Sequence, residues 1–269
     1  MPFEKIAFAD AVITRLIENQ GLYQLTNRSY DSLVQPGATS VRRQKLASLV
    51  VKKNTGTSPT SADRKKLKNA TTMVDTALDV YSVPLAAEAA AHFESNDQLR
   101  RDYEVSAAMA LMQQFDADVI AAAQATSQVQ VAPAGDLTWK TLTLPNKLMN
   151  VAKVPKEDRV VVVSANLEDQ FMNIDVIKNA ASFNLTVLNK GKFVEVLNMK
   201  FFISGLVEQI GGKDNIVGYY APGLAFILSK TGEWKEAWDG ENLQDNIDLL
   251  AHAAAELDGD EFAAVVKMP

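Results

Sequence analysis

The chain contains no cysteine and only two histidines, and these shortages exclude several kinds of chemistry. Without thiols it has no disulfides, no thiolate metal site and no cysteine nucleophile. His92 and His252 lie 160 positions apart, so a histidine zinc site or a His-based triad would have to use one of those two. We interpret both as packed or edge histidines, with pH sensing as the alternative because histidine titrates near neutrality.

Long apolar runs and the motifs of nucleotide-binding or hydrolytic enzymes are also missing. No stretch of 18 apolar residues occurs, which predicts that no helix spans a membrane. Residues 1–19 combine acids with a helical period, unlike a signal peptide, so we expect a cytoplasmic origin. Gly211-Gly212-Lys213 lacks the spacing of a phosphate-binding loop, and no G-x-S-x-G, H-E-x-x-H or EF-hand pattern is present. We therefore predict no catalytic residue, no metal site and no cofactor.

The composition is that of an ordinary globular protein, with 47% hydrophobic and 22% charged residues. Its 269 residues are enough for one large domain or two smaller ones. The net charge of −6 argues against a dedicated nucleic-acid binder, whose affinity would come from neutralising phosphates.

The charge is unevenly distributed along the chain. Residues 42–68 carry nine basic side chains and one acid, Asp63, which gives a local charge of +8 and leaves about −14 on the rest. This asymmetry predicts that the basic segment meets an acidic surface elsewhere. Docking or plain solvation is favoured over a grip on nucleic acid, because no aromatic residues are interleaved with the cations for base stacking.

Residues 37–74 are predicted to form a long basic hairpin. Turn-forming residues fill positions 54–61, and β-compatible residues precede them from Val41 to Val51. The return from Lys65 to Leu78 is either a second strand or a short helix. The segment has too few large apolar residues to bury itself, so it is either mobile or ordered by a neighbour.

The first half of the chain also contains two predicted helices and a strand. Apolar positions share one helical face over residues 4–19, and residues 22–41 then read as irregular. Alternation predicts a half-buried strand over residues 79–85. A long helix is expected from Ser95 or Asn96 to about Ala123, with a length of roughly 40 Å. The polar linker 124–136 is the best candidate for a domain boundary.

The second half reads as a mixture of short helices and strands. A helix is predicted over residues 142–151, and the apolar run 160–163 predicts a central strand. Asn166 and Asp169 have the spacing of a helix cap. Residues 187–203 predict two strands joined near Asn198. The tail from Asn246 to Met268 has an alanine-rich segment, a turn at Asp258-Gly259 and a closing strand over Phe262–Val266.

Two further groups of residues allow both a functional and a purely structural interpretation. Asp116 and Asp118 are two positions apart on a helix and point to different faces, so we expect solvated or ion-paired acids rather than a metal site. The three tryptophans are interpreted as buried anchors, in the core or at a subunit contact, rather than as ligand stackers: Trp139, Trp234 and Trp238.

The order of these parts resembles the major capsid protein of tailed bacteriophages, whose fold is named after phage Hong Kong 97. The helix end Phe115-Asp116-Ala117-Asp118-Val119-Ile120 is similar to the end of the family's spine helix. The passage from Val154-Pro155 through Arg159 to Val160–Ser164 resembles the family's sequence of Pro, Arg, apolar strand and Ser. Leu188–Ser204 resembles its Gly-led double strand, except that Asn198 stands where Gly is usual; asparagine tolerates positive φ, so the turn can form.

The resemblance implies an α+β fold of the Hong Kong 97 type. Its parts would be an N-terminal arm, an extended β-hairpin called the E-loop, a peripheral domain with the long spine helix, an axial domain and a return to the peripheral domain. In this sequence they would cover residues 1–36, 37–74, 75–135, 136–233 and 234–269.

The resemblance also implies a structural role rather than an enzymatic one. Copies of the chain would assemble as hexamers and pentamers into an icosahedral phage head, formed in the bacterial host cytoplasm, around double-stranded DNA that is held without sequence-specific contacts. A separate scaffolding protein and a portal are expected partners, and no membrane is. The basic side chains expected at intersubunit contacts are Arg42, Arg43, Lys45, Lys52, Lys53, Arg64, Lys65, Lys66 and Lys68.

Two other functions remain open from the sequence. One is a cellular shell protein of the same fold that encloses cargo enzymes. The other is a soluble α+β enzyme with a carboxylate site. A phage gene neighbourhood would separate the first from a phage head, and particles in electron micrographs would remove the second.

Overall fold

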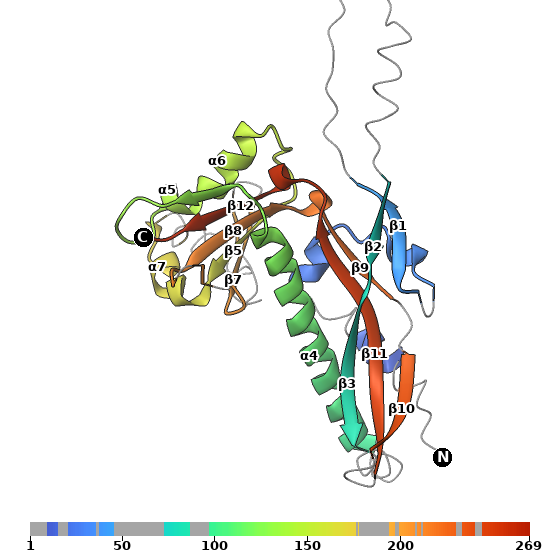
Figure 1. Ribbon diagram of the computed structural model, residues 1–269. Helices are drawn as coiled ribbons and strands as arrows, with labels where there is room; N and C mark the ends of the chain where they lie inside the picture. The colour runs from blue at the N-terminus through green and yellow to red at the C-terminus, as the bar shows by residue number, and fades with distance from the viewer. Residues whose placement is uncertain are drawn as a thin grey trace, which may run out of the picture.

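The computed structural model describes most of the chain outside the middle of the basic hairpin. The described residues are 10–15, 21–35, 38–45, 73–86, 97–175, 177, 194–196, 199–207, 209–210, 212–229, 233–239 and 244–269. The described part of the chain forms an elongated body in which a long helix and a long sheet run side by side, with a second sheet at one end (Figure 1).

The long helix α4 spans Asp97–Gln124, so the prediction of a helix of about this length is confirmed. Residues 10–15 are helical, in agreement with the prediction for 4–19; the other residues of that range lie outside the described part. Residues 21–35 are irregular as predicted, with two 3-10 turns at Leu22–Leu25 and Asp31–Leu33.

A four-stranded antiparallel sheet runs along α4, and its central strand is β11. Its members are β3 (Asp79–Ala86), β9 (Leu224–Leu228), β10 (Glu233–Asp239) and β11 (Gln244–Leu257). The alanine-rich part of the tail is therefore a strand. Leu249, Ala251 and Ala253 of β11 are buried in the same core cluster as the helix residues Ala107 and Ala108, so small side chains on both elements line this contact.

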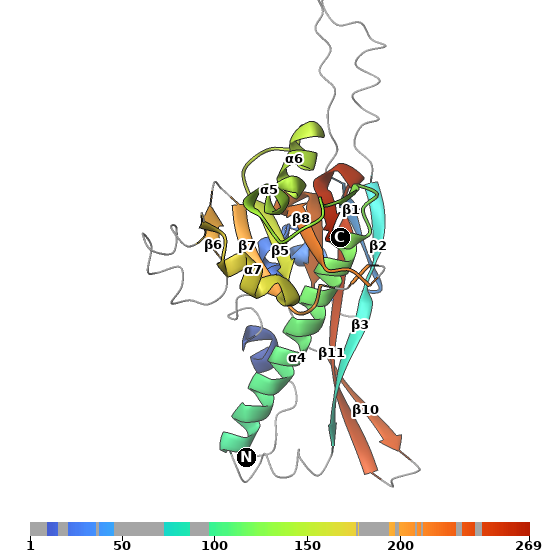
Figure 2. The same cartoon turned by 90° about the vertical axis from the view of Figure 1, so that its left-hand side faces the viewer.

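A six-stranded sheet forms the second lobe, in the order β4-β12-β8-β5-β7-β6 (Figure 2). Its members are β4 (Val129–Val131), β5 (Arg159–Ser164), β6 (Val194–Val196), β7 (Met199–Ser204), β8 (Asn215–Tyr220) and β12 (Ala263–Lys267). Every residue of β5 is buried, which confirms the central strand predicted from the apolar run.

Short helices accompany this sheet. They are α5 (Trp139–Leu142), α6 (Leu144–Val151) and α7 (Glu168–Met172). The predicted cap of α7 is wrong: Leu167 occupies the N-cap position without a side-chain bond, and Asn166 instead donates to Asp214 at 2.8 Å. A 3-10 turn at Ala165–Leu167 shifts the helix start beyond the predicted cap.

The strands of each sheet come from different segments of the division expected from the sequence. The expected linker 124–136 contains β4, which pairs in parallel with β12, and β12 belongs to the six-stranded sheet. Conversely, β9 lies within the expected axial segment but pairs with β11 of the four-stranded sheet. The division into five segments stays a prediction.

The principal core lies between α4 and the two sheets. Phe115 of α4 is fully buried and its ring contacts three aromatic rings, with centroid distances of 5.1 Å to Tyr81, 5.9 Å to Tyr23 and 5.3 Å to Phe226. Phe115 belongs to α4 and Tyr23 to the N-terminal segment, whereas Tyr81 lies on β3 and Phe226 on β9 of the long sheet. The helix is thereby fixed in the position that joins the two lobes.

Candidate subunit-contact site

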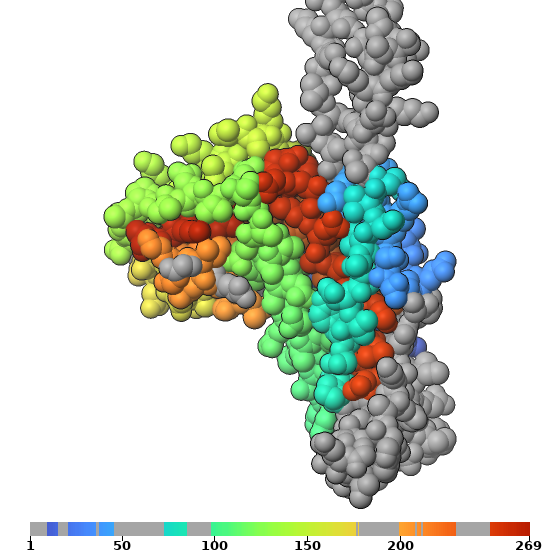
Figure 3. All heavy atoms as spheres, in the orientation of Figure 1, coloured from blue at the N-terminus to red at the C-terminus, as the bar shows by residue number. Residues whose placement is uncertain are grey.

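The base of the basic hairpin is the part of the expected contact site that the structure describes. Strand β1 (Ser40–Gln44) pairs with β2 (Met73–Ala77) in antiparallel register, and β2 continues directly into β3. Figure 3 shows these segments lying against the end of β11. Of the expected contact residues, Arg42, Arg43 and Lys45 are described; the following lie outside the described residues: Lys52, Lys53, Arg64, Lys65, Lys66 and Lys68.

Arg42 and Arg43 point to opposite faces of β1, because successive side chains in a strand alternate. The Arg42 side chain is 71% exposed, and its Nε lies 3.7 Å from a carboxylate oxygen of the equally exposed Asp75. The Arg43 side chain is fully buried. Two adjacent arginines of one basic segment thus have opposite environments.

The buried Arg43 is held entirely by its own chain. Its Nη1 forms an ion pair with Asp258, whose side chain is also fully buried, and its Nη2 lies 2.9 Å from Oε2 of Glu256. Its Nε donates to Oγ1 of Thr76 at 2.8 Å. The guanidinium also lies 5.6 Å from the ring centroid of Tyr30, within the range of a cation–π contact. We call Arg43, Thr76, Glu256 and Asp258 the Arg43 cluster.

Glu256 receives hydrogen bonds and charge from several sides of the Arg43 cluster. Its Oε1 lies 2.6 Å from the Lys45 ammonium, and Oε2 accepts from the Thr76 hydroxyl at 2.6 Å. Partial burial raises the pKa of this carboxyl, but the hydrogen bonds and the two neighbouring cations outweigh burial and lower the pKa to about 2. Burial lowers the pKa of Arg43, and its two carboxylate partners more than restore it, so the pKa is raised.

Two of the nine basic residues have acidic partners in their own chain. Arg43 and Lys45 pair with Glu256 and Asp258 of the same chain, and a contact of either with a neighbouring subunit stays a prediction. The prediction that the basic segment meets an acidic surface elsewhere did not say which acids form that surface. Glu256 and Asp258 flank Leu257 at the end of β11, after its run of alanines, and their charge between apolar stretches was the available signal.

The depressed pKa of Glu256 predicts that acid weakens the hairpin base. Because the folded pKa is near 2 and the ordinary value is 4.5, the contribution of Glu256 is complete above about pH 4.5 and is lost as pH falls towards 2. We expect it to be about 2–3 kcal/mol, allowing for the partial exposure of the side chain. Unfolding by guanidinium between pH 6 and 3 should show a smaller acid loss in Glu256→Gln than in wild type. Equal pH dependence of both proteins would contradict this assignment.

The described part of the expected N-terminal arm also lies on its own chain. Tyr23 is fully buried, and its backbone N–H donates to Oδ1 of Asp116 at 3.0 Å. Asn27 pairs with β9 through two backbone hydrogen bonds, and the buried Asp31 accepts from the N–H of Leu228 at 3.0 Å. Residues 21–35 therefore run along β9 as an added layer of the body.

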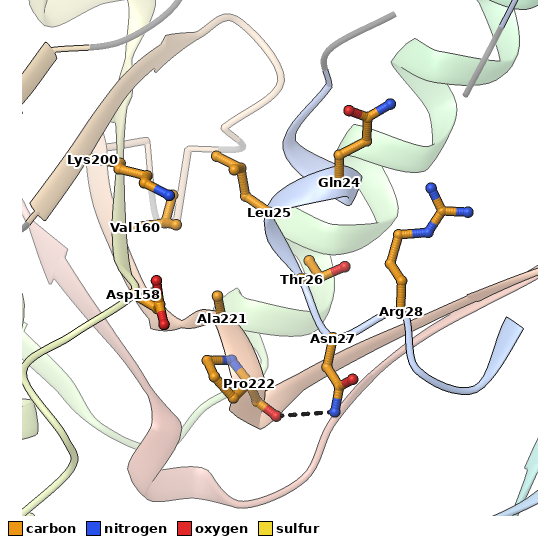
Figure 4. Close-up of a pocket in the computed structure, with 10 residues that line it drawn as sticks. All are labelled: Gln24, Leu25, Thr26, Asn27, Arg28, Asp158, Val160, Lys200, Ala221 and Pro222. Carbon is orange, nitrogen blue, oxygen red and sulfur yellow. Dashed lines mark hydrogen bonds between the residues drawn. The ribbon is translucent and has the colours of Figure 1, made fainter. Parts of the chain in front are cut away.

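A hollow of about 370 Å³ lies between this N-terminal segment and the six-stranded sheet (Figure 4). One wall is formed by residues 24–28, and the other includes Asp158, Val160 and Lys200. The side-chain amide of Asn27 donates to the Pro222 carbonyl at 3.4 Å and closes one end. The two walls come from segments far apart in the sequence, and the hollow contains cations and one acid but no arrangement of nucleophile and base.

Asp116 and Asp118 of α4 point to different elements, as their spacing predicted. Asp116 accepts from the Tyr23 backbone N–H, whereas Asp118 accepts from the Tyr81 hydroxyl at 2.7 Å. Within the described residues, no group of three or more His, Asp or Glu side chains is placed to hold a metal ion. Among the described helices, none is both long and apolar enough to cross a membrane.

Two of the other singled-out residues are described with their side chains. Trp139 is partly buried, with its ring centroid 6.2 Å from that of Phe201, in agreement with an anchor in the core. His252 is 8% exposed within β11, in agreement with a packed histidine. His92 and the side chains of Trp234 and Trp238 lie outside what the structure describes.

The sequence has no match among protein-family models or among curated proteins. Solved structures do match over nearly the whole chain. A chain of mycobacterium phage Che8 has a TM-score of 0.60 and 16% identity over 92% of this chain and 91% of that one. A chain of mycobacterium phage Cain has a TM-score of 0.55 and 16% identity over 93% and 91%.

A third solved structure matches over most of both chains. The crystal structure of a virus-like particle from Pyrococcus furiosus has a TM-score of 0.55 and 10% identity, and the match covers 97% of both chains. At such low identities the likeness concerns the fold alone, over more than nine tenths of this chain. The chain therefore has the α+β fold of tailed-phage major capsid proteins, the Hong Kong 97-type fold.

Proposed function

We propose that this chain is the structural subunit of an icosahedral phage head, which self-assembles into the shell that encloses packaged double-stranded DNA. The observation that carries the proposal is the fold match over about nine tenths of both chains to a mycobacterium phage structure. The role is structural rather than enzymatic. Hexamers and pentamers of the chain would form the shell, with DNA inside held without sequence-specific contacts.

The described surface supports burial between copies. Residues 105–115 of the spine helix contain no charged side chain, although Val105 and Met109 are 37% and 51% exposed. On the six-stranded sheet, the edge strand β4 exposes Val129 and Val131 to 43% and 59%. Exposed apolar groups on rigid elements of this kind are suited to contacts between subunits.

The hairpin supplies a second kind of contact in this proposal. Its base is fixed by the Arg43 cluster, and the exposed Arg42 would meet an acidic surface of another copy, together with the expected contact residues that lie outside the described part of the chain. Such charges set the register of a contact more than its strength. Many weak contacts per subunit are sufficient, because closure of the shell makes them cooperative. A separate scaffolding protein and a portal would direct closure, and assembly would occur in the host cytoplasm before the head becomes part of the virion.

Expression of the chain, alone and with the neighbouring genes of its genome, tests this proposal. We expect closed particles of uniform size in negative-stain micrographs, and nuclease-resistant DNA in particles formed together with a portal and packaging proteins. A chain that stays monomeric at every concentration would overturn the proposal. Particles that enclose a co-expressed enzyme, from a genome without packaging genes, would instead support the cellular shell that encloses cargo.

A further inference from the structure

Apart from the passage through α4, the chain crosses between its two sheets at two places that lie together. It passes from β8 to β9 through a 3-10 turn at Ala221–Gly223, and from β11 to β12 through residues 258–262. The backbone N–H of Asp258 donates to the Gly223 carbonyl at 2.9 Å. We call residues 221–223 and 258–262 the junction.

The two passages of the junction are packed tightly against each other. A Cβ atom on Gly223 would lie 2.5 Å from Cγ of Phe262, so only glycine allows this approach. Phe262 is itself 5% exposed, and its ring centroid lies 5.9 Å from that of Tyr220 at the end of β8. A change in the angle between the sheets would therefore strain a small set of close contacts at the junction, besides the contacts that α4 makes with both sheets.

The base of the hairpin is attached to this same point. Asp258 is the first residue after β11, and its fully buried carboxylate pairs with the fully buried guanidinium of Arg43 on β1. Thr76 lies on β2, and its hydroxyl accepts a hydrogen bond from Arg43, so both strands of the hairpin base are attached to this ion pair. A buried ion pair that loses one partner leaves an uncompensated charge, so separation of the hairpin base from the junction is strongly opposed.

We propose that the Arg43–Asp258 ion pair makes the base of the hairpin and the junction move as one body. A change in the angle between the two sheets then changes the direction in which the hairpin leaves the subunit. The coupling is a property of the single chain. Its consequence for a shell rests on the proposed function: subunits that adopt different sheet angles in pentamers and hexamers would direct their hairpins differently.

Hydrogen exchange of the full chain, kept below the concentration at which it assembles, tests the coupling. In Arg43→Met we expect amides of the hairpin base (40–44 and 73–78) and of the junction to exchange at least about tenfold faster. Amides of Val161–Val163 in β5 should change less than about twofold. Arg42→Met is the matched control, because it removes the neighbouring exposed arginine of the same strand, and it should leave all these rates within about twofold. Uniform acceleration across the chain, or a junction unaffected by Arg43→Met, would overturn the proposal.

The coupling must also act in the opposite direction. Gly223→Ala perturbs the junction, so it should speed exchange at the Leu78 amide, which donates to the Thr39 carbonyl at 2.9 Å in the hairpin base. In a chain that already carries Arg43→Met, Gly223→Ala should speed exchange of the Leu78 amide only a little more. Additive effects would contradict the coupling. If Arg43→Met does not fold, Arg43→Lys replaces it, because a lysine keeps the charge but cannot hold both carboxylates, and the same regional pattern is expected at smaller size. A chain that never forms particles overturns the proposed function and leaves this measurement unaffected.

Discussion

Replacement of Arg159 by methionine is expected to lower the free energy of unfolding by roughly 3–5 kcal/mol, a large fraction of the stability of a typical domain. Arg159 is fully buried at the start of β5 and holds the loop between α6 and β5. Its Nε donates to the Pro155 carbonyl at 2.7 Å and its Nη2 to the Val154 carbonyl at 2.6 Å. Its Nη1 contacts Asn146 and donates to Oδ1 of Asn150 at 2.9 Å.

The partners of Arg159 explain the size of this effect. All its hydrogen bonds run to neutral oxygens, and burial lowers its pKa more than the nearby Tyr220 raises it. Methionine would relieve the desolvation of the charge but would leave the buried Val154 carbonyl and the part-buried Pro155 and Asn146 carbonyls without this donor, at a cost of up to about 1–3 kcal/mol each. Several such groups outweigh the relief, so the net effect is destabilising.

Denaturant unfolding of the purified chain measures this effect. Arg101→Met is the control, since Arg101 is an exposed arginine of α4, and it should change stability by less than about 0.5 kcal/mol. Arg159→Lys keeps the charge but cannot reach all the acceptors, so it should fall between the two. Arg159→Met within about 1 kcal/mol of wild type would show that the loop does not depend on this side chain.

Replacement of Gly218 by alanine is expected to destabilise the six-stranded sheet by about 1–3 kcal/mol. Gly218 lies in β8, between β5 and β12, where α6 packs over the sheet. A Cβ atom there would lie 2.5 Å from Cβ of Pro145 and 3.4 Å from Cε of Met149, so the helix would have to move away. Gly205→Ala is the matched control, because a Cβ at that glycine has no neighbour within 4 Å. Equal melting temperatures of the two variants would contradict this explanation.

The elements that were predicted correctly are those whose own residues indicate their secondary structure. The run Val160–Val163 is apolar at every position, and α4 has a long uninterrupted helical composition. Strand β4 was missed because Val129 and Val131 stand in a polar linker and form a strand only by pairing with β12. The alanines of β11 favour a helix by propensity, and their strand conformation comes from pairing with β3, β9 and β10.

The candidate site was predicted in its charge but not in its geometry. The excess of cations in 42–68 indicated acids elsewhere, yet Glu256 and Asp258 follow more than 200 positions later, and only the fold brings them to β1. The different roles of Arg42 and Arg43 depend on which face of β1 is turned to the body. That register is set by pairing with β2 and cannot be read from a segment rich in charges on both faces.

The position of the last two strands in the sequence has a consequence for how the chain folds. Strand β11 is central to the long sheet, and β12 lies between β4 and β8 in the other. During synthesis, neither sheet can be completed until residues 244–267 have left the ribosome. Folding dominated by such distant pairings is slow, and the incomplete sheets expose strand edges. We therefore expect nascent chains to depend on chaperones until the final strands are released, which would also delay assembly until each subunit is complete.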